Sequence, residues 1–125
     1  MNGEEINELS NRIIGLALEV HKALGPGFVE KIYQKALAYE FKEAKITFEE
    51  QKRIKVNYKG VYLGDQRVDY LVQNEIILEL KSVSEINEIH EAQLLSYLKT
   101  TDKRLGLILN FAKKKLDIKR LVNKL

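Results

Sequence analysis

The chain of 125 residues contains no cysteine. This absence excludes disulfide bonds, thiolate metal ligands and thiol nucleophiles, and it is compatible with a reducing cytoplasm. No apolar run approaches the length of a membrane span, and the polar, acidic segment 1–10 has no hydrophobic stretch of the kind found in secretion signals. We therefore expect a cytoplasmic protein that does not contact a membrane.

The chain also lacks a strong excess of either charge. It has 21 basic and 18 acidic residues, which give a formal net charge of +3 and a pI near 9.0. This balance excludes a histone-like polycation but permits contact with a polyanion. The hydrophobic content of 45% favours a globular fold over disorder. We expect a single domain spanning residues 1–125.

Proline occurs only once, between two glycines at positions 25–27. The Gly-Pro-Gly sequence predicts the end of one helix and a change of direction. Before it, apolar residues recur every three or four positions over residues 4–24, and a similar stripe follows over about 29–44. Both patterns are typical of amphipathic helices.

The rest of the chain alternates in the manner of strands. Residues 47–63 favour β structure and are broken at Lys59-Gly60, which predicts a two-stranded hairpin. Strands are also expected at 68–72, 76–80, 105–111 and 116–122, with a helix at about 88–101. The order is two helices, four strands, a helix and two strands. It predicts an α/β fold, an α+β mixed sheet flanked by helices in which the last helix is a crossover connection.

Three charged residues lie in two of these predicted strands, namely Asp69, Glu79 and Lys81. Buried charges are costly unless they are paired or bind a metal, so their presence here requires a chemical reason. Glu79 and Lys81 are two residues apart and therefore project from the same face of a strand. Asp69 joins them if it lies opposite Glu79, which requires an odd-numbered loop such as 73–75.

Metal-dependent phosphodiester cleavage would explain this set. Opposed carboxylates repel each other, and a divalent cation reverses that penalty. Oxygen ligands without thiolates favour Mg²⁺ or Mn²⁺ over zinc. The Lys81 ammonium would orient a water nucleophile or stabilise negative charge on a phosphate. A surface ion pair on an edge strand is the alternative explanation, because Glu-x-Lys is a common pattern.

Other candidates have equally ordinary alternatives. Gln93 and Tyr97 share a helix face and can bind a phosphate or a water, or they form the polar margin of a core helix. Glu30 lies in the first turn of its helix, where a carboxylate is stabilising without any catalytic role. Tyr58 and Tyr62 are expected to be half-buried strand residues rather than platforms for bases. The basic segment 113–124 would contact phosphates or protect an edge strand.

The sequence resembles a known family at several points. The segment 21–33 contains Gly27, Glu30 and Tyr33 and resembles the signature of the small prokaryotic GxxExxY proteins. Arg67-Val68-Asp69, Glu79-Leu80-Lys81, Glu91-Ala92-Gln93-Leu94 with Tyr97, and Asn110-Phe111 look like the same family in the same order. That family is placed in the PD-(D/E)XK nuclease superfamily, whose restriction-endonuclease-like fold is a mixed sheet flanked by helices. Val68 stands where the superfamily name has proline.

The resemblance implies a role for each matching residue. Asp69 and Glu79 would bind the metal, Glu30 would be an accessory acidic ligand, and Lys81 would be the catalytic lysine. Gln93 and Tyr97 would contact metal-bound water or the substrate phosphate.

The expected function is therefore Mg²⁺- or Mn²⁺-dependent hydrolysis of DNA. One active site in a small domain would require a homodimer to cut both strands. Two alternatives stay open, because a fold alone defines neither substrate nor reaction. One is a catalytically inactive nucleic-acid-binding or interaction module, and the other is a nuclease specific for RNA or for junctions.

Overall fold

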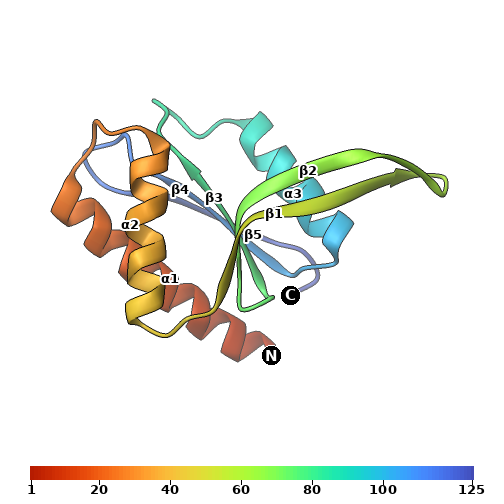
Figure 1. Ribbon diagram of the computed structural model, residues 1–125, viewed down its shortest axis with the longest axis horizontal. Helices are drawn as coiled ribbons and strands as arrows, with labels where there is room; N and C mark the ends of the chain where they lie inside the picture. Colours follow the sequence, from red (N-terminus) through yellow and green to blue (C-terminus); the bar gives the residue numbers. More distant parts are fainter.

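The structure is a computed structural model that describes all residues, 1–125. A five-stranded sheet in the order β1-β2-β3-β4-β5 forms its centre, with helices on both faces (Figure 1). Neighbouring strands are antiparallel except β3 and β4, which are parallel and joined through the crossover helix α3. The elements are α1 (Gly3–Leu24), α2 (Glu30–Glu43), β1 (Phe48–Tyr58), β2 (Val61–Val72), β3 (Ile76–Lys81), α3 (Glu88–Thr101), β4 (Leu105–Asn110) and β5 (Asp117–Val122). The expected mixed sheet flanked by helices is confirmed.

The number of strands was predicted wrongly. Two strands were expected where β2 runs without interruption from Val61 to Val72, so the sheet has five strands and not six. The two expected strands were the second strand of the hairpin at 47–63 and the separate segment 68–72. Gly64 has a φ of 149° and lies beside a β-bulge at Val56/Asn57, so the glycine bends the strand without ending it.

Two separate cores fix the helices to the sheet. The larger core, with 19 buried residues, lies between the sheet and the pair α1 and α2, and the smaller core, with eight, lies under α3. Successive β3 residues divide between them: Ile76, Leu78 and Leu80 enter the larger core and Ile77 enters the smaller one. Alternation therefore puts Glu79 on the α3 face of the sheet.

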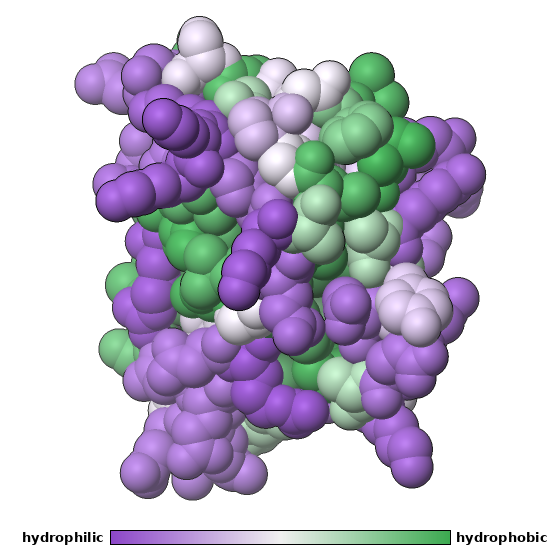
Figure 2. Space-filling view, turned by 90° about the vertical axis from the view of Figure 1, so that its left-hand side faces the viewer, coloured by the Kyte–Doolittle hydropathy of each residue, from purple (hydrophilic) through white to green (hydrophobic).

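The remaining surface is mostly polar. Figure 2 shows the end of the molecule at which α1 and α2 are joined, where hydrophilic side chains cover most of the face and hydrophobic ones gather in its upper part. The connection and the first turn of α2 contribute Phe28, Val29 and Ile32, all of which are exposed. No helix is both long and apolar enough to cross a membrane.

The outer parts of β1 and β2 project beyond the rest of the molecule as a two-stranded ribbon, residues 51–67, on the right of Figure 1. Lys59 and Gly60 form its turn with φ values of 49° and 80°, as the two-residue hairpin predicted from the sequence requires. Tyr58 and Tyr62 are 60% and 56% exposed, so the expectation of half-buried tyrosines is wrong. No helix covers the end of the ribbon (Figure 1).

Candidate active site

Asp69 and Glu79 lie side by side where β2 and β3 separate. The two strands pair from Val72↔Ile76 to Tyr70↔Leu78, so the next position in this register is Asp69 opposite Glu79. The three-residue loop 73–75 sets the register, and its odd length is the one the sequence argument required.

Beyond this point, hydrogen bonds from backbone N–H groups to carboxylates replace the backbone–backbone hydrogen bonds between β2 and β3. The Leu80 N–H donates to Oδ2 of Asp69 at 2.7 Å, and the Asp69 N–H donates to Oε1 of Glu79 at 3.4 Å. Each strand therefore satisfies a backbone donor with a carboxylate from its neighbour. Both carboxylates are thus fixed by the sheet itself.

Burial raises the pKa of both groups, and the Asp69 charge adds to the rise for Glu79. Burial is the main cause that raises the pKa of Asp69, and the Leu80 N–H and the Lys81 ammonium oppose it. Glu79 is only 8% exposed, and burial together with the Asp69 charge raises its pKa to about 8. A pair of adjacent carboxylates with raised pKa values is the electrostatic pattern of a functional site.

Lys81 is half-buried at the end of β3, two residues beyond Glu79 on the same face of the strand. Its ammonium opposes the rise in the pKa values of Glu30, Asp69 and Glu79 and is thus within electrostatic reach of all three. None of the six ion pairs in the structure involves Lys81. The ammonium is available to an anionic ligand.

The segment after Lys81 is fixed by Asn110, which is fully buried and pairs with Lys81 across β3 and β4. Its Oδ1 accepts from the N–H groups of Val83 and Ala112, at 3.1 and 3.2 Å, and its Nδ2 donates to the Val83 carbonyl at 2.8 Å. The Phe111 N–H donates to the Lys81 carbonyl at 2.9 Å. These bonds hold the end of β3 in place.

Glu30 approaches the carboxylates from α2. It lines, with Asp69 and Gln51, a cleft of about 410 Å³ between α2 and the first two strands. Burial raises the pKa of Glu30, and the Asp69 charge adds to the rise. The N-terminal ends of α2 and α3 and the C-terminal end of β3 all lie toward the upper end of the molecule in Figure 1. Helix N-termini favour bound anions.

Gln93 and Tyr97 come from α3. Tyr97 is 7% exposed, packs in the smaller core, and donates its hydroxyl proton to Oε1 of Gln66 at 3.3 Å. Burial and the Glu79 charge raise its pKa, and the Gln93 amide beside it lowers the pKa. Gln93 itself is exposed. Tyr97 is therefore near the carboxylates but is held first by packing.

The acidic residues do not form a complete metal cage. No group of three or more His, Asp or Glu side chains lies close enough to hold a metal ion. Asp69 and Glu79 are adjacent. Glu30 interacts with them electrostatically from α2: the Asp69 charge raises the pKa of Glu30, and the Glu30 charge raises the pKa of Glu79. The structure thus brings two carboxylates together and keeps the third at a distance.

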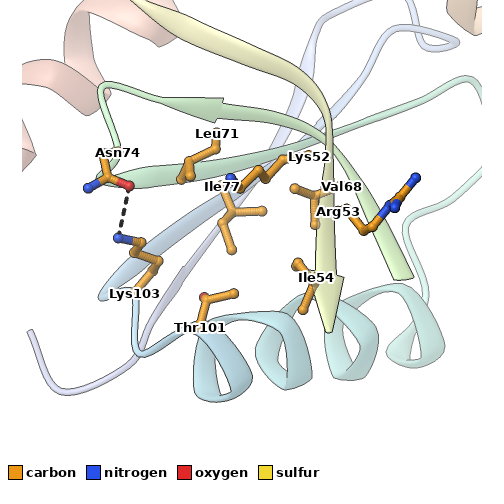
Figure 3. A pocket seen from close by; sticks show the side chains of 9 residues that line it. All are labelled: Lys52, Arg53, Ile54, Val68, Leu71, Asn74, Ile77, Thr101 and Lys103. Atoms are coloured by element: carbon orange, nitrogen blue, oxygen red, sulfur yellow. Dashed lines mark hydrogen bonds between the residues drawn. The ribbon is translucent and has the colours of Figure 1, made fainter. Parts of the chain in front are cut away.

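A second cavity, of about 180 Å³, lies at the base of the ribbon (Figure 3). Its floor is apolar, with Ile54, Val68, Leu71 and Ile77, and Lys103 donates to Oδ1 of Asn74 at its edge at 3.2 Å. None of the candidate site residues lines it. It is a gap between α3 and the sheet rather than part of the site.

Sequence reasoning missed several supporting residues. Gln51 has a φ of 49°, and its side chain bonds to Asp69 and lowers the pKa of that carboxyl. Only the pairing register of β1 and β2 brings the two residues together, and the sequence alone does not specify it. Tyr33 donates to the Gly25 carbonyl at 2.6 Å and accepts from the Phe28 N–H at 3.1 Å, so it fixes the α1–α2 connection. His21 lies in the last turn of α1, and its Nε2 is 2.8 Å from the Lys113 carbonyl oxygen.

Comparisons with known proteins agree with this architecture. A solved crystal structure of the protein SSO0001 superimposes with a TM-score of 0.58 at 19% identity, over 76% of this chain and 50% of that one. The likeness shows a shared fold, and the match spans only half of the SSO0001 chain. No curated protein matches the sequence. A family model described as the PD-(D/E)XK nuclease superfamily matches residues 7–121. The chain belongs to the PD-(D/E)XK nuclease superfamily.

Proposed function

We propose that this chain is a metal-dependent nuclease that hydrolyses phosphodiester bonds of DNA, acting as one domain of the GxxExxY kind. One observation carries the proposal. Asp69 and Glu79 lie side by side in a buried setting that raises both pKa values, and Lys81 follows two residues later with no ion-pair partner. A packed sheet has no structural need for this arrangement, because the same positions filled by apolar residues would carry no desolvation cost.

The residues present fit a hard divalent cation. Mg²⁺ is usually held by one or two carboxylates and keeps several waters, so two adjacent carboxylates suffice and a third need not touch the metal. Asp69 and Glu79 are the proposed ligands, and Glu30 would act across the cleft, directly or through water. Bound Mg²⁺ or Mn²⁺ would neutralise the carboxylates, polarise the phosphate and make water more acidic.

The protein's own groups have separate roles in this proposal. Lys81, held by the end of β3, donates to the attacking water or to a nonbridging phosphate oxygen and stabilises the developing negative charge. The Tyr97 hydroxyl and the Gln93 amide donate to the same phosphate and orient it for in-line attack. Asn110 positions Lys81 by fixing the chain after β3.

A catalytically inactive binding module is the second candidate function. The observation that favours it is the lack of a preformed group of three acidic side chains. A nuclease acting on RNA or on junctions would use the same residues. A homodimer is also proposed for cutting two strands, with exposed Phe28, Val29 and Ile32 as the apolar surface nearest the site.

The test is cleavage of labelled single-stranded, duplex and branched DNA and of RNA with Mg²⁺ or Mn²⁺. We expect metal-dependent products from the wild-type chain and a loss of at least about 10³-fold in rate for Asp69→Asn and for Lys81→Ala. Products of equal yield from wild type and both variants would refute these roles. No cleavage of any substrate, with nucleic acid still bound, would establish the binding module instead.

A further inference from the structure

The ribbon formed by residues 51–67 has a charge that differs from the rest of the molecule. It carries five basic residues, Lys52, Arg53, Lys55, Lys59 and Arg67, and a single acidic residue, Asp65. Its formal net charge is +4, whereas the whole chain is +3, so the remaining residues sum to −1. The positive charge available to a polyanion is therefore concentrated on the projecting ribbon.

The two faces of the ribbon differ. Ile54 and Val68 are buried in the smaller core under α3, so residues that alternate with them point away from α3. Those residues are Arg53, Lys55, Asp65 and Arg67, all exposed. Arg53 and Arg67 are directly opposite each other across the two strands. Like charges in that position are destabilising unless an anion lies between them, and Arg53 is only partly compensated by Asp65 at 3.3 Å.

The tip of the ribbon is apolar and aromatic. Tyr58, Val61, Tyr62 and Leu63 are all 56% to 62% exposed around the Lys59-Gly60 turn. The Tyr62 hydroxyl donates to Oδ1 of Asp65 at 2.8 Å, and the Lys59 ammonium lies 5.4 Å from the centre of the Tyr58 ring. Tyr62 pairs with Asn57 and so shares the face of Arg53 and Lys55, whereas Tyr58 lies on the other face of the tip beside Lys59. Exposed rings at the tip are suited to stack on bases that are not already stacked in a duplex.

The ribbon also leads directly to the proposed site. Arg67 is two residues from Asp69 on the same strand, which corresponds to about 7 Å, and the tip is roughly 26 Å away at the usual strand rise. A nucleic acid strand lying along the ribbon would therefore cover several nucleotides before it reached the carboxylates. A second copy of the ribbon is a poor occupant, since two surfaces of +4 repel each other.

We infer that the β1–β2 ribbon is a substrate-binding arm for single-stranded nucleic acid, with the sugar-phosphate backbone along Arg53, Lys55 and Arg67 and unpaired bases on Tyr62 and, around the turn, on Tyr58. The inference rests on the proposed nuclease function and names the substrate class of that site. In this inference, the outer part of β2 binds the nucleic acid and the inner part of β2 carries the proposed metal ligand Asp69. Binding by the arm is thus measurable without any metal.

The experiment is fluorescence anisotropy in the presence of a chelator, so that cleavage does not enter. The probes are a labelled single strand of about 20 nucleotides as DNA, the same sequence as RNA, and the blunt DNA duplex. The charge variant is Lys55→Gln with Arg67→Gln, and the aromatic variant is Tyr58→Ala with Tyr62→Ala. The matched control is Lys22→Gln with Lys42→Gln, which removes two exposed charges from the last turns of α1 and α2.

Each variant has its own expected signature. The charge variant should bind single strands about tenfold more weakly and lower the slope of log Kd against log salt concentration by about 1.4, for two lost phosphate contacts. The aromatic variant should lose at least about tenfold on single strands and keep its salt slope. Tyr58→Phe with Tyr62→Phe should restore binding, and the control should change Kd by less than about twofold.

Four results would overturn the inference. They are unchanged binding by both ribbon variants, equal losses in the control, tighter binding of the duplex than of the single strand, or a change from dimer to monomer in the aromatic variant. The last would assign the tip to a contact between copies. The proposed nuclease function has a separate failure criterion, namely a wild-type chain that binds nucleic acid but never cleaves it with Mg²⁺ or Mn²⁺. Comparison of Kd for the DNA and RNA single strands shows which of the two the arm prefers.

Discussion

The two halves of β2 have opposite characters although they belong to one continuous strand. The inner half, residues 68–72, is packed on both faces and carries Asp69 against Glu79. The outer half, residues 61–67, is mostly exposed and is basic on one face. In the proposed function this difference has a purpose. The carboxylates would be held rigidly where the strand is packed on both faces, and the exposed basic half would contact the nucleic acid.

The largest expected effect concerns pH and the inner half alone. Because folding raises the pKa of Glu79 from 4.5 to about 8, the folded state binds this proton more tightly than the unfolded state does. The stabilisation is fully present below the unfolded pKa and is lost as the pH rises through about 8. The metal-free protein should lose about 3 kcal/mol of unfolding free energy between pH 5 and 8.

Urea unfolding with a chelator measures this loss, and Glu79→Gln is the variant that isolates it. The variant should be more stable than wild type at the high end of the range and nearly equal at the low end. If wild type and Glu79→Gln had parallel pH profiles, the burial of a charged Glu79 would be the wrong explanation.

Metal addition should act on the same half and in the opposite direction. A cation that binds only the folded state adds about 2.7 kcal/mol of stability at a hundred times its Kd. We expect Mg²⁺ or Mn²⁺ to raise the unfolding free energy of wild type above neutral pH, and to do so far less for Asp69→Asn. A matched outer variant, Asp65→Asn, should be stabilised by the metal as wild type is. If wild type, Asp69→Asn and Asp65→Asn were all stabilised equally, Asp69 would not be a metal ligand.

A smaller effect is expected from the support behind Lys81. Replacing Asn110 by alanine removes three buried hydrogen bonds to Val83 and Ala112 and should cost about 2 kcal/mol. Cleavage should fall as well, because the end of β3 loosens. Chemical denaturation and a rate assay on the same preparation check both, and full stability in Asn110→Ala would show that these bonds are not needed.

The smallest effect concerns the packing of α3 on the sheet. A methyl group on Gly106 would lie 2.8 Å from a Leu94 side-chain carbon, so Gly106→Ala should destabilise the fold by about 1 to 2 kcal/mol. Gly15 on α1 has open space around it, and Gly15→Ala should instead stabilise by about 0.5 to 1 kcal/mol. Thermal unfolding of the two variants should therefore shift in opposite directions, and a shared direction would contradict this packing.

The inner half was the more predictable of the two. The sequence argument made the pairing of Asp69 with Glu79 conditional on an odd-numbered loop, and the three-residue loop 73–75 meets that condition. In the outer half, the strand was expected to end at residue 63, because a ribbon without a core against it has no reason to alternate apolar and polar residues. Its exposed tyrosines were misassigned for the same reason.

Long-range details were beyond the sequence for physical reasons. Gln51 reaches Asp69 only through the β1–β2 register and a residue with positive φ, which short-range patterns do not specify. The distance of Glu30 from the carboxylates depends on how α2 packs on the sheet, and a position in the first helical turn carries no information about it.

One measurement tests the central claim most directly, namely single-turnover cleavage of a labelled DNA strand at saturating protein with Mg²⁺. The account predicts that Lys81→Ala binds the strand as wild type does but cleaves it at least about 10³-fold more slowly, while Lys55→Gln with Arg67→Gln requires more protein and then reaches the wild-type rate. Cleavage by Lys81→Ala at the wild-type rate, or none by wild type, would contradict the account.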